Sequence, residues 1–292
     1  MTALDIKNWE DLDDFQKLTV TEFSYSRIDT YEMCPAKYFY SYIKREPRGF
    51  SAPAVLGNIV HFVLENTISP DKPLSLEEMN EEYEKGRAQY DPRSAVSDDL
   101  ISVGHEIINE FYDINQETKF KVYGKEVGFN FIIGNYSIIG FIDRIDVDGD
   151  DVFIVDYKTG KREVAAKDVA KNLQMGIYAL AVSALFPGKN ITASLHYLRT
   201  NRLKSHTYSE EDLLFVKESL IKRIQKILND SNFTPTSNER MCSFCDHAES
   251  GACRSRCNKI KENEKRHIKN PLAETRGFIL TILYILEVCD WV

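Results

Sequence analysis

The chain has 292 residues, of which 43% are hydrophobic and 28% are charged. This length suits one large domain, and the composition is that of a globular protein, which excludes a fibrous or largely disordered chain. The formal net charge of −8 argues against a protein that coats nucleic acid by bulk electrostatic attraction, because phosphate binding requires lysine and arginine at the contact surface.

The first twenty residues are acidic and lack the basic start and apolar run of a secretory signal. We therefore expect an N-terminal extension over 1–20 in a cytoplasmic protein of a prokaryotic or viral host cell, with no membrane partner. Thiols stay reduced in that compartment, so the six cysteines are not expected to form disulfides, and the clustered ones point to metal binding, whereas Cys289 is expected to be a buried thiol.

The first half of the chain predicts helices. Ser24 can cap a helix that runs to about residue 43 with an interruption at Cys34-Pro35. A second helix is expected over 53–68, and polar helical patterns fill 74–117. Together these segments predict a helical lobe over 21–118.

The second half predicts a sheet and two long helices. Residues 120–158 are rich in β-branched and aromatic side chains, and turn signals at Gly134-Asn135 and Asp148-Gly149 divide them into three antiparallel strands. A helix over 165–186, strands over 191–199 and 204–208, and a helix over 210–228 follow. We expect an α/β fold with its catalytic core over 119–232.

The C-terminal part contains a basic stretch over 254–269, with seven lysines and arginines against two glutamates. It predicts either a nucleic-acid contact or an ordinary solvated helix face. The apolar run after residue 278 is too short for a bilayer, which needs about twenty residues. We expect a packed C-terminal helix over 270–292, following a cysteine cluster and basic segment over 233–269.

Two predicted strands each place a carboxylate after an apolar run. If the hairpin turns on Gly149-Asp150, Asp143 lies directly opposite Asp156 on one face of the sheet, and Lys158 shares that face. A turn on Asp148-Gly149 keeps the two carboxylates diagonal on the same face, whereas a three-residue turn would separate them.

Opposed carboxylates repel one another unless a cation lies between them, and their oxygen atoms suit Mg²⁺ or Mn²⁺. Such an ion polarises a phosphodiester and lowers the pKa of a bound water. Lys158 could then stabilise the transition state. The simpler alternative is an ordinary ion pair of Asp156 and Lys158 at the end of a strand.

Several motifs occur in the order typical of one nuclease group. They are Gly57-Asn58-Ile59-Val60-His61, the Gly140–Asp143 segment, Asp156-Tyr157-Lys158 and Gln174-Met175-Gly176-Ile177-Tyr178. Together they resemble the RecB-type PD-(D/E)XK nucleases, which include AddB-type recombination nucleases and CRISPR-associated adaptation exonucleases.

The resemblance implies a restriction-endonuclease-like core, a mixed sheet flanked by helices. It makes Asp143, Asp156 and Lys158 catalytic, and it assigns Mg²⁺ or Mn²⁺ to His61, Asp143, Asp156 and Tyr157. Gln174 and Tyr178 would support the site and its DNA. Taken alone, His61, Gln174 and Tyr178 would be unremarkable helix residues, and Glu126 is either a further metal-site carboxylate or a surface residue.

The late cysteines are Cys242, Cys245, Cys253 and Cys257, and a local zinc site is one interpretation of their spacing. The family resemblance instead implies a [4Fe–4S] cluster that joins Cys34 to Cys242, Cys245 and Cys253, with Cys257 as the alternative fourth ligand. Such a clamp would close a loop of about two hundred residues.

The expected function is a metal-dependent DNA nuclease, and the resemblance implies an exonuclease acting on DNA ends or single strands in recombination, repair, replication or defence. The alternatives are an iron–sulfur DNA-binding scaffold that works beside a helicase, and a zinc-dependent interaction module. The sequence contains no phosphate-binding loop of the helicase type, so we expect a separate helicase or recombination protein as partner.

Overall fold

The computed structural model describes residues 7–8, 21–47, 49–242, 245–249 and 253. The chain divides into two compact units, of which unit 1 comprises 1–32 and 49–232, and unit 2 comprises 33–48 and 233–292. The predicted basic stretch 254–269, Cys257 and the C-terminal helix 270–292 lie outside the described residues.

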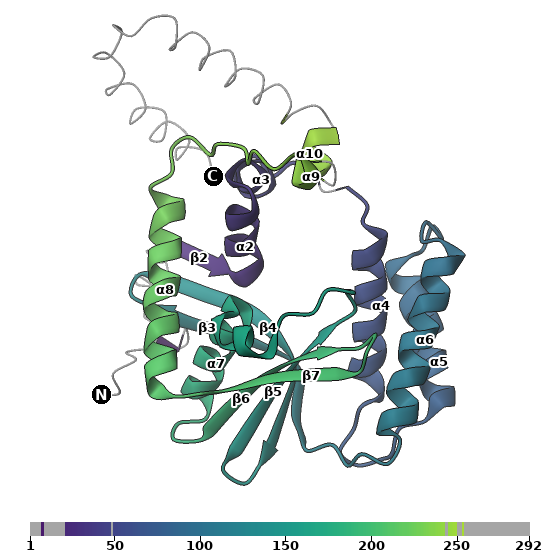
Figure 1. Ribbon diagram of the computed structural model, residues 1–292. Helices are drawn as coiled ribbons and strands as arrows, with labels where there is room; N and C mark the ends of the chain where they lie inside the picture. Colours follow the sequence, from purple (N-terminus) through teal and green to yellow (C-terminus); the bar gives the residue numbers. More distant parts are fainter. Residues whose placement is uncertain (1–6, 9–20, 48, 243–244, 250–252, 254–292) are drawn as a thin grey trace, which may run out of the picture. The chain divides into compact units, whose positions relative to one another are not determined.

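Unit 1 is built on a seven-stranded mixed sheet with the order β1-β3-β4-β5-β6-β7, and β2 pairs in parallel with β4 (Figure 1). β5 and β6 are also parallel, and the other pairs are antiparallel. The strands are β1 (Lys7–Asn8), β2 (Thr21–Ser24), β3 (Val122–Ile133), β4 (Tyr136–Asp148), β5 (Asp151–Lys158), β6 (Asn190–Tyr197) and β7 (Arg202–Tyr208). This mixed sheet flanked by helices confirms the predicted α/β class.

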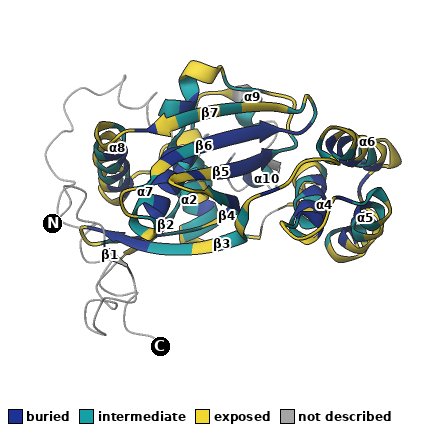
Figure 2. Ribbon diagram, turned by 90° about the horizontal axis from the view of Figure 1, so that it is seen from below, coloured by how far each residue is buried: buried dark blue, intermediate teal, exposed yellow. Residues whose placement is uncertain are grey.

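The helices of unit 1 form two groups (Figure 2). Three of them, α4, α5 and α6, stand together beside one end of the sheet, while α7 packs on β6 and α8 packs on α7. The helices of unit 1 are α2 (Tyr25–Met33), α4 (Ala52–Thr67), α5 (Leu76–Tyr90), α6 (Asp98–Asn115), η3 (Ala166–Lys171), α7 (Leu173–Leu185) and α8 (Glu210–Leu228). In the described part of the chain, none of the helices has the length and apolarity needed to cross a membrane.

Helix ends follow local capping chemistry. The Ser24 hydroxyl accepts a hydrogen bond from the Arg27 amide, as expected for a cap of α2. The prediction of one continuous helix over 165–186 was wrong, because Asn172 has an extended backbone and its side chain accepts from the Met175 amide. That cap starts α7 afresh, and the preceding residues form the short 3₁₀ helix η3.

The hairpin between β4 and β5 has the first of the registers that the sequence left open. Arg144 pairs with Val155 and Asp148 pairs with Asp151, so the turn lies on Gly149-Asp150, with Gly149 in the left-handed region at φ 61°. β2 occupies the same edge of β4 further along, where it pairs with Tyr136 to Ile139. Residues 140–143 therefore have no ladder partner on this edge among the described strands, and a gap opens there between two paired segments.

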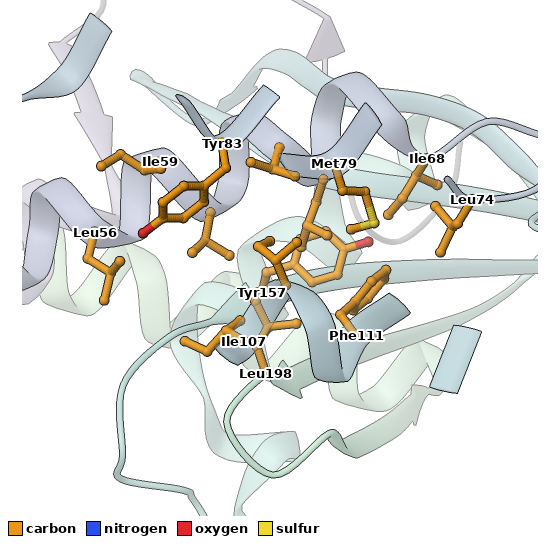
Figure 3. Close-up of a cluster of buried hydrophobic side chains, with 14 of the residues drawn as sticks. Leu56, Ile59, Ile68, Leu74, Met79, Tyr83, Ile107, Phe111, Tyr157 and Leu198 are labelled. Atoms are coloured by element: carbon orange, nitrogen blue, oxygen red, sulfur yellow. The ribbon is translucent and has the colours of Figure 1, made fainter. Parts of the chain in front are cut away.

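The three helices beside the sheet share a hydrophobic core with the ends of β5 and β6 (Figure 3). Tyr157 is buried in this core against Phe111, with their ring centroids 6.3 Å apart. Tyr83 is completely buried, and its hydroxyl donates a hydrogen bond to the Ile101 carbonyl at 2.9 Å. The core therefore reaches from α5 and α6 directly to the strand that carries the predicted catalytic residues.

Unit 2 joins an early and a late segment of the chain. Its described elements are α3 (Pro35–Tyr38), the π-helical turn η2 (Phe39–Ile43), α9 (Glu239–Cys242) and α10 (Asp246–Glu249). Cys34 is extended, with φ −163° and ψ 112°, and Pro35 follows at the first helical position. The predicted interruption at Cys34-Pro35 is thus confirmed.

We predict that Gly104→Ala destabilises unit 1. Alanine normally favours a helix interior by up to about 1 kcal/mol over glycine, but a Cβ at position 104 would overlap the buried Tyr83 hydroxyl. We therefore expect a loss of about 1–3 kcal/mol in the free energy of unfolding, measured by urea titration. The double variant Gly104→Ala/Tyr83→Phe should recover part of the loss, and a stabilised single variant would contradict this packing.

Candidate metal and catalytic site

His61 lies on α4 and faces the end of β5. Its Nε2 donates a hydrogen bond to the Tyr157 carbonyl at 3.0 Å, and its Nδ1 lies 3.5 Å from Asp143 Oδ2. A Cβ at Gly57, one turn earlier on α4, would stand 3.5 Å from the Thr159 hydroxyl. The glycine and the histidine of the first motif therefore bring α4 against the chain just before and just after Lys158.

Asp143 lies on β4 where the gap in the sheet edge begins. Its Oδ2 accepts a hydrogen bond from the Tyr157 amide at 2.7 Å, which joins the two strands beyond their last ladder pair. On the other side, the register of β3 and β4 places Glu126 across from Asp143. His61, Glu126 and Asp143 each offer one ligand atom within 4.8 Å of the others.

Glu126 has a left-handed backbone, with φ 46°. This conformation costs a residue with a side chain about 1–2 kcal/mol, and such strain occurs mainly at functional sites. The neighbouring Lys125 ammonium donates to the Glu65 carbonyl and, at 2.8 Å, to the Ile68 carbonyl at the end of α4. The strand that carries Glu126 is thus fixed to the helix that carries His61.

Asp156 and Lys158 form a second part of the site. Asp156 is 2% exposed, and its Oδ2 lies 2.7 Å from Lys158 Nζ. Lys158 also donates to Gln174 Oε1 at 2.9 Å, and Gln174 Nε2 donates to the Tyr178 hydroxyl at 2.9 Å. Gln174 and Tyr178, four residues apart on α7, therefore hold the lysine in place from a second element.

The carboxylates dominate the electrostatics of the site. Burial raises the pKa of Asp156 to about 6, the Asp143 charge adds to that rise, and Lys158 opposes it. Burial disfavours the charged form of His61, but its interactions with Asp143 and the charge of Asp156 outweigh this and raise its pKa. Burial, together with Asp143 and Glu65, also raises the pKa of Glu126. In all three groups the neighbouring carboxylates contribute to the raised pKa, and a bound cation would offset that contribution.

The structure thus gathers His61, Asp143, Tyr157, Asp156, Lys158, Gln174 and Tyr178 into one region of unit 1. Asp156 is not in the group of ligand atoms within 4.8 Å, because its carboxylate pairs with Lys158. Sequence reasoning left the role of Glu126 open, since only the register of β3 places it. It missed Tyr25, whose phenol pKa is raised to about 12 by burial, by the adjacent Asp29 and by the charge of Asp156.

The donor set suits a hard divalent cation. Two carboxylates and one imidazole converge, and the Tyr157 carbonyl oxygen lies beside them. Oxygen-rich sites of this kind favour Mg²⁺ or Mn²⁺. Beside this donor set, the Lys158 ammonium can stabilise negative charge on a substrate. Its contacts with Asp156 and Gln174 fix the position of the ammonium.

The cysteines of unit 2 form a separate candidate site. Cys34 and Cys253 are buried, and Cys242 and Cys245 are half-buried in the same hydrophobic cluster, with Ala36, Tyr40 and Ala248. The Thr236 amide donates to Cys34 Sγ at 3.4 Å. Residues about two hundred positions apart are therefore packed together around four thiols.

Comparison with known proteins gives a family match over most of the chain. Residues 22–254 match the model of the PD-(D/E)XK nuclease superfamily. The similar proteins include an ATP-dependent helicase/deoxyribonuclease subunit of Carboxydothermus hydrogenoformans, 29% identical over 60% of this chain and 20% of that protein. The subunit of the same name from Clostridioides difficile is 24% identical over 69% of this chain and 21% of that protein.

The Gene 69 protein of Mycobacterium phage L5 is also similar, with 25% identity over 41% of each chain. The chain spans about a fifth of the length of the two helicase/deoxyribonuclease subunits. The similarity therefore concerns one part of those larger proteins.

We predict that Asp156→Asn stabilises the metal-free protein at neutral and alkaline pH. A group whose pKa is raised by folding contributes stability at low pH and loses it as the pH rises through the folded value. At about pH 8 in EDTA, the variant should therefore exceed the wild type by on the order of 1–3 kcal/mol in free energy of unfolding.

This advantage should shrink as the pH falls through about 6, where the wild-type carboxyl becomes protonated. Asp151→Asn, an exposed change at the other end of β5, is the matched control and should show no such trend. Denaturant titration across the pH range measures both, and a less stable Asp156→Asn at alkaline pH would refute the assigned cause.

Proposed function

Because the chain belongs to the PD-(D/E)XK nuclease superfamily, we propose that it is a metal-dependent DNA nuclease that acts as an exonuclease on DNA ends or single strands. The observation that carries this proposal is the convergence of His61, Glu126 and Asp143 beside the bonded pair of Asp156 and Lys158. The similarity to helicase/deoxyribonuclease subunits supports DNA as the substrate.

We assign Mg²⁺ or Mn²⁺ to His61, Asp143, Asp156 and the Tyr157 carbonyl, with Glu126 as a further carboxylate. When bound, the ion polarises the phosphodiester and lowers the pKa of a water molecule. Asp143 and Asp156 would supply the negative charge that holds it. Lys158, still held by Gln174, then stabilises charge on the scissile phosphate.

The pairing of Asp156 with Lys158 has a chemical meaning. Because Asp156 is buried, the lysine partly neutralises a carboxylate that would otherwise be uncompensated. The ammonium is thereby kept at the place where substrate charge will arrive. The hydrogen bond from Lys158 to Gln174, which itself donates to the Tyr178 hydroxyl, holds the ammonium in this position independently of Asp156.

We further propose that the four cysteines of unit 2 hold a [4Fe–4S] cluster through Cys34, Cys242, Cys245 and Cys253, and that the protein acts with a helicase partner. Thiols that share one apolar cluster suit iron–sulfur ligation, and an amide hydrogen bond to sulfur, such as the one from Thr236 to Cys34, is a common feature there. The names of the related subunits support the helicase.

We predict that end-labelled single- or double-stranded DNA is degraded with Mg²⁺ or Mn²⁺ and not in EDTA. Asp156→Ala and Lys158→Ala should each lower the rate at least about 100-fold, because one removes a metal ligand and the other the cation at the phosphate. Glu126→Gln should keep activity but require more metal. Gel analysis of the products gives the rate and the polarity.

Asp151→Ala is the matched control, since it removes an exposed carboxylate from the same strand, and it should cut at the wild-type rate. Wild-type protein that binds DNA but leaves it uncut under all metal conditions would instead favour a scaffold beside a helicase.

We predict that protein purified without oxygen is brown and contains about four iron atoms per chain, as a [4Fe–4S] cluster requires. Cys34→Ala should remove the iron and lower the melting temperature, because it detaches the early segment from the late one. Colourless protein with one zinc ion would overturn the cluster assignment in favour of a zinc site.

A further inference from the structure

One basic stretch of this acidic chain begins on the strand that carries Asp156 and Lys158. Between Lys158 and Lys204 there are nine lysines and arginines and only two carboxylates, Glu163 and Asp168, whereas the whole chain carries −8. Helix α7 contributes none of these charges. The cations instead lie mainly in the linker between β5 and α7, which includes η3, and in the segment formed by the β6–β7 turn and the first residues of β7.

These two segments are held together by specific contacts. Glu163 of the linker accepts a hydrogen bond from the Thr200 hydroxyl at 2.6 Å, and its Oε2 lies 3.3 Å from Lys204 Nζ and 3.8 Å from Arg202. The Val164 amide donates to the Tyr197 hydroxyl at 3.0 Å. The linker is therefore fixed along the turn rather than projecting alone into solvent.

The combined surface begins at the catalytic strand. The Arg199 guanidinium donates to the Thr159 carbonyl at 2.6 Å, and the Leu198 amide donates to the Lys158 carbonyl at 2.9 Å. Lys161 follows Lys158 by three residues, so their Cα atoms are at most about 11 Å apart. We define the cationic surface as the following seven residues: Lys161, Arg162, Lys167, Lys171, Arg199, Arg202 and Lys204.

Four members of the cationic surface are exposed and form no ion pair with any other described residue, namely Lys161, Arg162, Lys167 and Lys171. Glu163 pairs with Arg202 and Lys204, so it does not neutralise the four exposed linker cations. A polyanion that binds across these unpaired cations gains both Coulomb energy and the entropy of released counterions.

We propose that the cationic surface binds the phosphate backbone of the nucleic-acid strand whose scissile phosphate reaches Asp156 and Lys158. The inference rests on the proposed nuclease function and adds the path of the strand on the β5–α7 side of the site. It also explains how a chain of net charge −8 can bind a polyanion, because the required charge is local.

The test compares two fourfold variants with the same change in net charge. The first removes the four exposed linker cations. The second removes four exposed lysines elsewhere in unit 1, which lie before α5, on α5, just before β3 and on α8. The variants are Lys161→Gln/Arg162→Gln/Lys167→Gln/Lys171→Gln and, as control, Lys72→Gln/Lys85→Gln/Lys121→Gln/Lys222→Gln.

Binding of a fluorescent single-stranded oligodeoxynucleotide is measured by anisotropy in EDTA, over a series of salt concentrations. The slope of the logarithm of the binding constant against the logarithm of salt should fall by about 0.7 for each lost phosphate contact, and thus by up to about 3 for the linker variant. The control should keep the wild-type slope. Thermal unfolding verifies that both variants are folded.

An unchanged slope in the folded linker variant, equal losses in both variants, or no binding by the wild type would overturn the proposal. Because EDTA prevents cutting, the outcome is separate from that of the nuclease assay. Wild type that cuts DNA while the linker variant keeps its slope refutes only the cationic surface. Wild type that never cuts, with the slope reduced in the linker variant alone, refutes only the nuclease assignment.

Discussion

The backbone of Tyr157 is the connection on which the candidate site depends. Its amide donates to Asp143 and its carbonyl accepts from His61, so one peptide segment orients groups from β4 and α4 at once. Its side chain is buried against Phe111, and its hydroxyl accepts from Arg144 at 2.5 Å. Packing of the Tyr157 side chain in the core therefore fixes the backbone groups that orient Asp143 and His61.

The gap in the edge of β4 makes this arrangement possible. On this edge of β4, β5 pairs only as far as Arg144 and β2 pairs only with Tyr136 to Ile139. Asp143 lies between these two paired segments, so its side chain can accept a hydrogen bond from the Tyr157 amide. Asp143 and Asp156 can then lie near one another at the end of β5. The stability of the rest of the fold offsets the energetic cost of their repulsion. The candidate site therefore lies where the regular pairing of the sheet is interrupted. Irregular and strained backbone is common at functional sites.

Sequence patterns predicted those parts of the fold that depend on neighbouring residues. The hairpin turn at Gly149-Asp150 was one of the alternatives that the sequence left open, and the break at Cys34 followed from the proline after it. Short strands such as β2 escaped prediction because four residues carry too little periodicity, and their pairing with β4 is decided by tertiary contacts.

The same distinction applies to the candidate site. Asp143, Asp156 and Lys158 were suggested by spacing along two adjacent strands. Glu126 was ambiguous because its place opposite Asp143 depends on β3 pairing and on a left-handed backbone that no local motif announces. Tyr25 was missed because only the folded chain brings the start of α2 within reach of the Asp156 charge.

The composition of unit 2 also determines when it can assemble. Cys34 leaves the ribosome about two hundred residues before Cys242, which at 5–20 residues per second is roughly 10–40 s of synthesis. During that time Ala36 and Tyr40 lack the late residues that cover them in the folded protein. The residues of unit 1 all precede Phe233 and are synthesised before Cys242, so unit 2 assembles after the chain of unit 1 has been made, and any metal it holds must be delivered after that point.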